Sequence, residues 1–197
     1  MHDRDPNAPP GWSYNPASWP QRVPIIIAAI VGFAIAMYLA LYQWRVFDTV
    51  YEPFFGDDSR VILRESAVSQ HSRAIFGVPD AFLGALGYLA DAIAGVIGSV
   101  RRWKTMPWLV VLFGFSVGPL GAISVLLVIL QPFSGGWCTL CLLTAVISVV
   151  MIGPAMDEVL ASLQYVRAEQ RAGRSGWRAF WGLDERQPAP QLGLTRG

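Results

Sequence analysis

Long apolar stretches alternate with short polar ones along this chain. No Asp, Glu, Lys or Arg occurs from Pro24 to Trp44 or from Pro107 to Met156, and the stretch from Val78 to Val100 carries only Asp80 and Asp91 as charged residues. About twenty helical residues, at roughly 1.5 Å each, cross a hydrocarbon core of about 30 Å. The pattern therefore predicts membrane-spanning helices in all three stretches.

The longest apolar stretch is predicted to hold two spans. A turn-forming run, Gln-Pro-Phe-Ser-Gly-Gly, interrupts it at 131–136. We therefore expect four spans, at about 24–44, 78–100, 107–130 and 137–156, and an all-α fold, a four-helix transmembrane bundle. The alternative is a water-soluble core of four buried helices, but 197 residues are too few to wrap such helices in polar layers.

Composition agrees with a membrane protein. Hydrophobic residues make up 53% of the chain and charged residues 15%, whereas soluble domains carry about a quarter charged residues. The net charge of +1 gives no reason to expect a nucleic-acid partner. Membrane lipid is the expected surrounding.

The distribution of basic residues predicts the orientation. Eleven of the 15 Lys and Arg residues lie on the side of the two termini, so the positive-inside rule predicts that both termini are cytoplasmic in the cell's inner membrane. The 45–77 loop and the 131–136 turn then face the outer side. Residues 1–23 are expected to form a polar cytoplasmic segment, and 157–197 a cytoplasmic amphipathic helix followed by a flexible tail.

The two cysteines of the chain form a Cys-x-x-Cys motif at the expected outer end of the fourth span. A spacing of three places the sulfurs of Cys138 and Cys141 on one helix face, within reach of a disulfide. The N–H groups of a first helical turn stabilise a thiolate at the leading cysteine, which suits thiol–disulfide exchange. The alternative is that both cysteines only pack between helices. No metal site is expected, because a closed zinc site needs four ligands and His2 is predicted on the opposite side.

Asp80 and Asp91 are the two acidic residues predicted within a span. They are eleven positions apart, close to three helical turns, and therefore share one helix face. Ionisable groups inside a membrane are costly and are candidates for function. Asp80 also follows Pro79 at a helix start, where a carboxylate suits the helix terminus. Asp91 has serines 116 and 124 of the third span as candidate partners, and a carrier or channel using both carboxylates is a further alternative.

These features together resemble the vitamin K epoxide reductase family over roughly residues 24–156. The resemblance rests on four spans, a long outer loop, a Cys-x-x-Cys opening the fourth span, and the stretch from Asp80 to Tyr88. It implies that the motif exchanges electrons with a membrane quinone, ubiquinone or menaquinone. Cys141 would face the quinone, Cys138 would exchange with incoming thiols, and Asp80 would stand where the family commonly has a quinone-binding Asn.

The chain departs from the family pattern at three places. Asp80 replaces the Asn, and Ala145 stands where animal members have a second quinone-binding residue, a Tyr. The 45–77 loop contains no cysteine, although the family usually has a relay pair there. We therefore expect a separate thioredoxin-like thiol protein to reach Cys138 directly. The function expected is that of a membrane thiol–quinone oxidoreductase, and the alternative is a non-catalytic assembly or interaction subunit.

Overall fold

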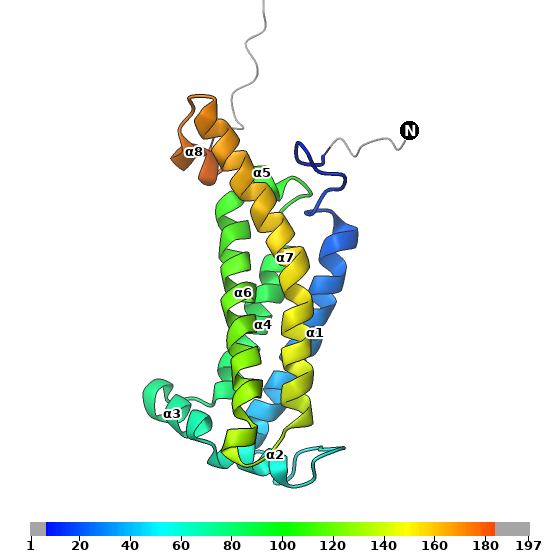
Figure 1. The fold of residues 1–197 in the computed structure, drawn as a ribbon, viewed down its shortest axis with the longest axis vertical. Coiled ribbons are helices and arrows are strands. Elements are labelled where there is room, and N and C mark those ends of the chain that lie inside the picture. Colours follow the sequence, from blue (N-terminus) through cyan, green and yellow to red (C-terminus); the bar gives the residue numbers. More distant parts are fainter. Residues whose placement is uncertain (1–6, 184–197) are drawn as a thin grey trace, which may run out of the picture.

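Four long helices form the body of the protein in the computed structural model, which describes residues 7–183 (Figure 1). They are α1 (Trp19–Gln43), α4 (Asp80–Val96), α6 (Pro107–Leu130) and α7 (Thr139–Arg171). No strand occurs within 7–183, and the prediction of an all-α transmembrane bundle is confirmed. Residues 1–6 and the final part of the predicted tail, from 184 on, lie outside the described residues.

The helices differ in their ability to cross a bilayer. α1, α6 and α7 have 25, 24 and 33 residues and are each long and apolar enough to span it. α4 has 17 residues and is about 25 Å long. It qualifies as a span only together with the segment Asp58–Phe76, from which it is bent by 74°. The described part of the chain thus holds three spans, or four with this bent pair.

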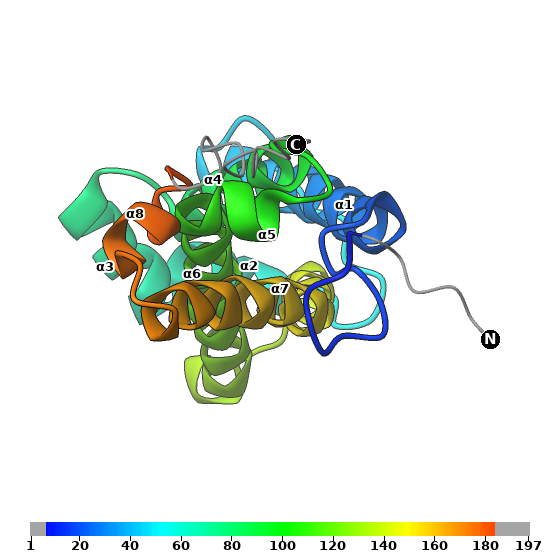
Figure 2. The same cartoon turned by 90° about the horizontal axis from the view of Figure 1, so that it is seen from above.

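The segment between α1 and α4, expected as a loop, is largely helical. It contains α2 (Asp58–Arg60), the π-helix η1 (Val61–Glu65) and α3 (Ala67–Phe76). Serines at positions 66, 69 and 72 recur every three residues and are buried, so small polar side chains form the inner face of this segment. We call residues 44–76 the cap, because they cover one end of the bundle, at the bottom of Figure 1. Seen along the bundle, α3 projects sideways from it (Figure 2).

The chain leaves the cap through a tight turn. Gly77 has φ +71° and ends α3, a left-handed conformation that glycine adopts without steric cost. Pro79 follows and precedes the first residue of α4. This turn places Asp80 next to the cap, at the first position of α4.

The amphipathic helix expected after Pro154 is the continuation of α7. α7 runs without a break through Pro154 to Arg171, so one helix provides both the last span and its polar extension. The short helices α5 (Arg102–Thr105) and α8 (Gly176–Phe180) lie at this end of the bundle, opposite the cap (Figure 1).

Small residues allow the helices to approach closely. α1 packs mainly on α4, and α6 on α7. A Cβ on Gly32 of α1 would lie 2.6 Å from the ring of Tyr88 on α4, so glycine is needed for this ring to fit. The outward faces remain apolar, with Ile27, Phe115 and Val150 more than half exposed. Such surfaces suit lipid, where helices associate through close packing of small residues.

Two buried arginines hold the end of the bundle opposite the cap. Arg22 donates to the carbonyl oxygens of Gly95 (2.8 Å) and Ile97 (2.9 Å), at the end of α4. Arg102 donates to Ile97 (2.9 Å) and forms an ion pair with Glu158 of α7. All three charged side chains are about 1% exposed. The arginines satisfy helix-end carbonyls that would otherwise lack partners.

Candidate active site

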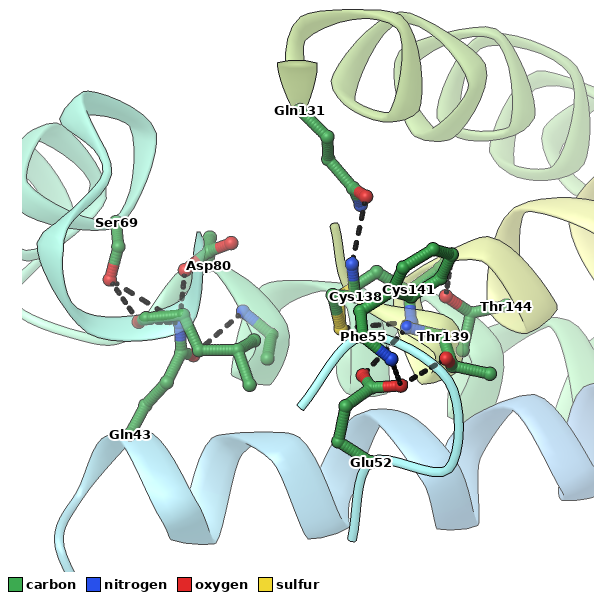
Figure 3. The surroundings of a disulfide bond; sticks show 12 residues. Gln43, Glu52, Phe55, Ser69, Asp80, Gln131, Cys138, Thr139, Cys141 and Thr144 are labelled. Carbon is green, nitrogen blue, oxygen red and sulfur yellow. Dashed lines mark hydrogen bonds between the residues drawn. A yellow bond between two sulfur atoms is a disulfide. The ribbon is translucent and has the colours of Figure 1, made fainter. Parts of the chain in front are cut away.

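The two cysteines are joined in a disulfide at the start of α7. Their Cα atoms are 5.3 Å apart. Cys138 is the N-cap residue, and its Sγ accepts a hydrogen bond from the backbone N–H of Cys141 at 3.2 Å. The N–H of Cys138 donates to Oε1 of Gln131 at 3.1 Å, which fixes the turn before the helix (Figure 3).

The two sulfurs have different surroundings. Cys138 is 1% exposed and lies among Leu39, Tyr42 and Leu63, where α1 meets the cap. Cys141 lies one helical turn further on and lines a cavity that is bounded by helices of the bundle and by the cap, including Leu63. Cys138 does not line this cavity.

The cavity beside Cys141, which we call the disulfide cavity, is small and mostly apolar. It has a volume of about 130 Å³, slightly less than that of an apolar protein cavity of about 150 Å³ that holds one benzene ring. Its polar lining residues include Asp80, Tyr88, Ser124 and Thr144. The structure thus brings Asp80 and Cys141, 61 positions apart in the chain, to one cavity.

Asp80 is held in place by Gln43, the last residue of α1. The Gln43 amide donates from Nε2 to Asp80 Oδ1 at 2.7 Å and to the carbonyl of Leu63 at 2.7 Å, and its Oε1 accepts from the N–H of Ala81 at 3.3 Å (Figure 3). Gln43 is 2% exposed. One buried amide therefore ties together α1, the cap and the start of α4. Sequence analysis did not identify Gln43, because its role depends on this three-way contact.

Tyr88 places a phenol group in the cavity wall. Its hydroxyl donates to the carbonyl of Thr144 at 2.6 Å and lies 2.7 Å from Oγ of Ser148. Ala145, which stands at the position of a Tyr in animal members of the resembled family, is buried beside these residues on α7. The hydroxyl of Tyr88, on α4, thus lies against α7 close to Ala145.

A second and larger cavity, which we call the interhelical cavity, adjoins the first. It has a volume of about 690 Å³ and is bounded by residues of α3, α4, α6 and α7. Asp80, Tyr88 and Ser124 line both cavities, whereas Asp91 lines the interhelical cavity but not the disulfide cavity. Asp91 therefore does not meet the cysteines, and the two acidic residues occupy different positions along one hollow. The volume of the interhelical cavity is within the range of ligand pockets.

Glu52 clamps the cap onto the helix that carries the cysteines. Its Oε2 accepts from the N–H of Thr139 at 2.9 Å, and its Oε1 accepts from the Thr139 hydroxyl (Figure 3). Oε1 also accepts from the backbone N–H of Phe54 and Phe55, and the Phe55 ring stacks on Trp137 with centroids 6.1 Å apart. Sequence analysis missed Glu52, because its partner Thr139 is 87 positions away.

These contacts set the protonation behaviour of Glu52. Burial acts to raise the pKa of Glu52, but the hydrogen bonds from Thr139, Phe54 and Phe55 outweigh it and hold the pKa below its usual value. The folded-state pKa is therefore depressed, and the clamp stabilises the closed cap at pH values above the usual glutamate pKa of about 4.3. This stabilisation is lost as the pH falls through the depressed value.

Acidification is thus expected to open the cap. Backbone hydrogen exchange of residues 45–57, corrected for intrinsic rates, should accelerate in the wild-type protein as the pH falls below the usual glutamate pKa of about 4.3 and through the depressed pKa of Glu52. In Glu52→Gln the same segment should exchange about tenfold faster at pH 7, because hydrogen bonds to a charged acceptor are lost, and should show little pH dependence. Equal, pH-independent exchange in both proteins would show that Glu52 does not hold the cap.

Within residues 7–183, no three His, Cys, Asp or Glu side chains come close enough to share a metal ion.

A helical membrane bundle with a Cys-x-x-Cys disulfide at the head of an apolar cavity has the architecture of a membrane thiol–disulfide protein. The family model of the vitamin K epoxide reductase family matches residues 23–155, about two thirds of the sequence, and the chain belongs to this family. At the level of the family, this means a membrane thiol-dependent quinone oxidoreductase. No curated protein and no solved structure matches the chain significantly.

Proposed function

We propose that this protein passes electrons from the thiols of a partner protein, through Cys138 and Cys141, to a membrane quinone. The observation that carries the proposal is the placement of the two sulfurs. Cys141 lines a mostly apolar cavity between the bundle helices and the cap, whereas Cys138 does not line it and is buried where α1 meets the cap. This arrangement suits an exchange of electrons between a lipid-soluble ring and a water-soluble thiol.

The thiol step begins at Cys138. A thiolate of the partner attacks its Sγ, the Cys138–Cys141 bond breaks, and Cys141 leaves as a thiol after taking up a proton. The second partner thiol then attacks the mixed disulfide, releases Cys138, and leaves the partner oxidised. Because the cap contains no cysteine, a thioredoxin-like partner has to reach Cys138 itself. The cap covers that sulfur, so the Glu52 clamp has to open first.

The quinone step takes place on the side of Cys141. The quinone ring occupies the disulfide cavity between Cys141 and Asp80, with the Tyr88 hydroxyl in the same wall. The two thiols give up two electrons and two protons, the disulfide re-forms, and the quinone becomes a quinol. Asp80 orients the ring in its protonated form: its Oδ1 already accepts from Gln43, so the second oxygen carries the proton and donates it to a carbonyl oxygen of the quinone.

The orientation of the bundle follows the charge distribution. The cap carries four arginines, and the other side of the membrane eleven basic residues. We therefore place the cap and the disulfide on the outer side and both termini in the cytoplasm. The disulfide then lies in an oxidising compartment, where thiol partners receive and donate disulfides.

Reduction of a quinone by the purified protein tests the proposal. The protein in lipid nanodiscs is reduced with a dithiol, freed of excess reductant and mixed anaerobically with menadione, a quinone with a bare two-ring head group. We expect one menadiol and one Cys138–Cys141 disulfide per protein, measured by absorbance and by thiol alkylation.

A variant in which both cysteines are serine is the matched control and should form no menadiol. Equal menadiol formation by this variant, or none by the wild-type protein, would contradict the proposed function. In the second case, a non-catalytic interaction subunit becomes the better account of the fold.

A further inference from the structure

Asp91 is a buried acidic residue that the proposed electron path does not use. It lies on α4, is 5% exposed, and interacts with the side chain of Ser116 on α6. Its Oδ1 is buried and has no hydrogen-bond partner among the described residues. A buried polar atom without a partner is costly, more so in a membrane, where water is not at hand. Asp91 is thus a buried carboxylate whose hydrogen bonds are incomplete.

The position of Asp91 points to a ligand in the interhelical cavity. Asp91 lines this cavity of about 690 Å³, and hydroxyl groups of Tyr88, Ser124 and Ser148 line it nearer the cysteines. Eleven helical positions separate Asp80 from Asp91, or about 16 Å, which exceeds the width of a two-ring head group. A ring that contacts Asp80 beside the disulfide consequently cannot contact Asp91 at the same time.

We propose that the interhelical cavity holds a second position for the substrate ring, at Asp91, and that this position selects the reduced form, a hydroquinone. The inference rests on the proposed function and deepens it. A hydroquinone carries O–H groups, and one of them donates to the Asp91 carboxylate at the cavity wall. A quinone carries only carbonyl acceptors, which cannot donate to a carboxylate. Product moving from Asp80 to Asp91 frees the disulfide cavity for the next quinone.

Equilibrium binding of both redox forms tests this selection. The background is the variant with both cysteines replaced by serine, which cannot turn over, in lipid nanodiscs under anaerobic conditions. Menadione and menadiol are the probes, and calorimetry gives their dissociation constants. We expect menadiol to bind more tightly than menadione. Asp91→Leu, an apolar substitution of similar volume, should weaken menadiol binding about tenfold, as expected for the loss of a hydrogen bond to a charged group, and change menadione binding less than about twofold.

Two further variants make the result specific. Asp91→Asn keeps one acceptor oxygen and should fall between the parent and Asp91→Leu for menadiol; it also serves if the leucine variant fails to fold. Asp80→Asn should change menadione binding instead. Equal loss of both probes in Asp91→Leu, no loss of either, or tighter binding of menadione than of menadiol in the parent would overturn the second position. Failure of the proposed function has a different signature, because then neither probe binds the parent.

Discussion

Replacing Cys141 by serine is expected to reduce quinone reduction to the background rate and to trap the thiol partner. Transfer of two electrons needs the disulfide to re-form, so either single serine variant should be inactive with menadione. In Cys141→Ser, the remaining thiol of Cys138 attacks the disulfide of an oxidised partner and forms a mixed disulfide that Cys141 can no longer resolve; alkylation of the partner's freed thiol preserves it. A mixed disulfide, seen as a reducible shift on a gel, is the expected product.

Cys138→Ser is the contrasting variant. It should be equally inactive and form no mixed disulfide, because Cys141 lines the disulfide cavity, where we place the quinone. Leu143→Ile, a change on the exposed face of α7, should keep full activity. Mixed disulfides in Cys138→Ser but not in Cys141→Ser would reverse the roles of the two cysteines.

Replacing Glu158 by alanine is expected to cause a large loss of stability. Glu158 is the carboxylate partner of Arg102, and both side chains are 1% exposed. Its removal leaves the buried charges of Arg102 and Arg22 without an anion. Breaking a buried ion pair in this way costs about 3–5 kcal/mol, which should appear as a lower free energy of unfolding in mixed micelles.

The matched control is Glu65→Ala in the cap. Glu65 pairs with Arg60, and their side chains are 55% and 65% exposed; exposed pairs contribute about 0–1 kcal/mol. Its unfolding should therefore differ little from that of the wild-type protein. Similar losses in both variants would show that the buried arginines do not depend on Glu158.

The sequence predicts the bundle well because membrane spans are encoded locally. An apolar stretch of sufficient length has to form a helix in a bilayer, where backbone groups find no other partners. The start of α7 at the Cys-x-x-Cys motif and of α4 at Asp80 follow from the same local signals, a glycine-rich turn and a proline. α7 continues through Pro154 although the composition changes there, because a change of polarity does not end a helix.

The cap and its clamp could not be predicted because they depend on distant contacts. Glu52 is an unremarkable acidic residue in the sequence, and its importance comes from Thr139, 87 positions further along. Gln43 likewise acquires a role only where α1, the cap and α4 meet. The sequence contains one local feature that indicates a helix in the cap: serines at 66, 69 and 72 recur every three residues, a spacing that places them on one helix face.

The redox state of Cys138 and Cys141 in native membranes is the most direct test of the central claim. Thiols are tagged with an alkylating reagent of high mass in cells with and without their quinone, and the shift is compared before and after reduction. The account predicts a disulfide when quinone is present, two free thiols when it is depleted, and the disulfide again when quinone is restored. Free thiols under every condition, or a disulfide that does not respond to quinone, would contradict it.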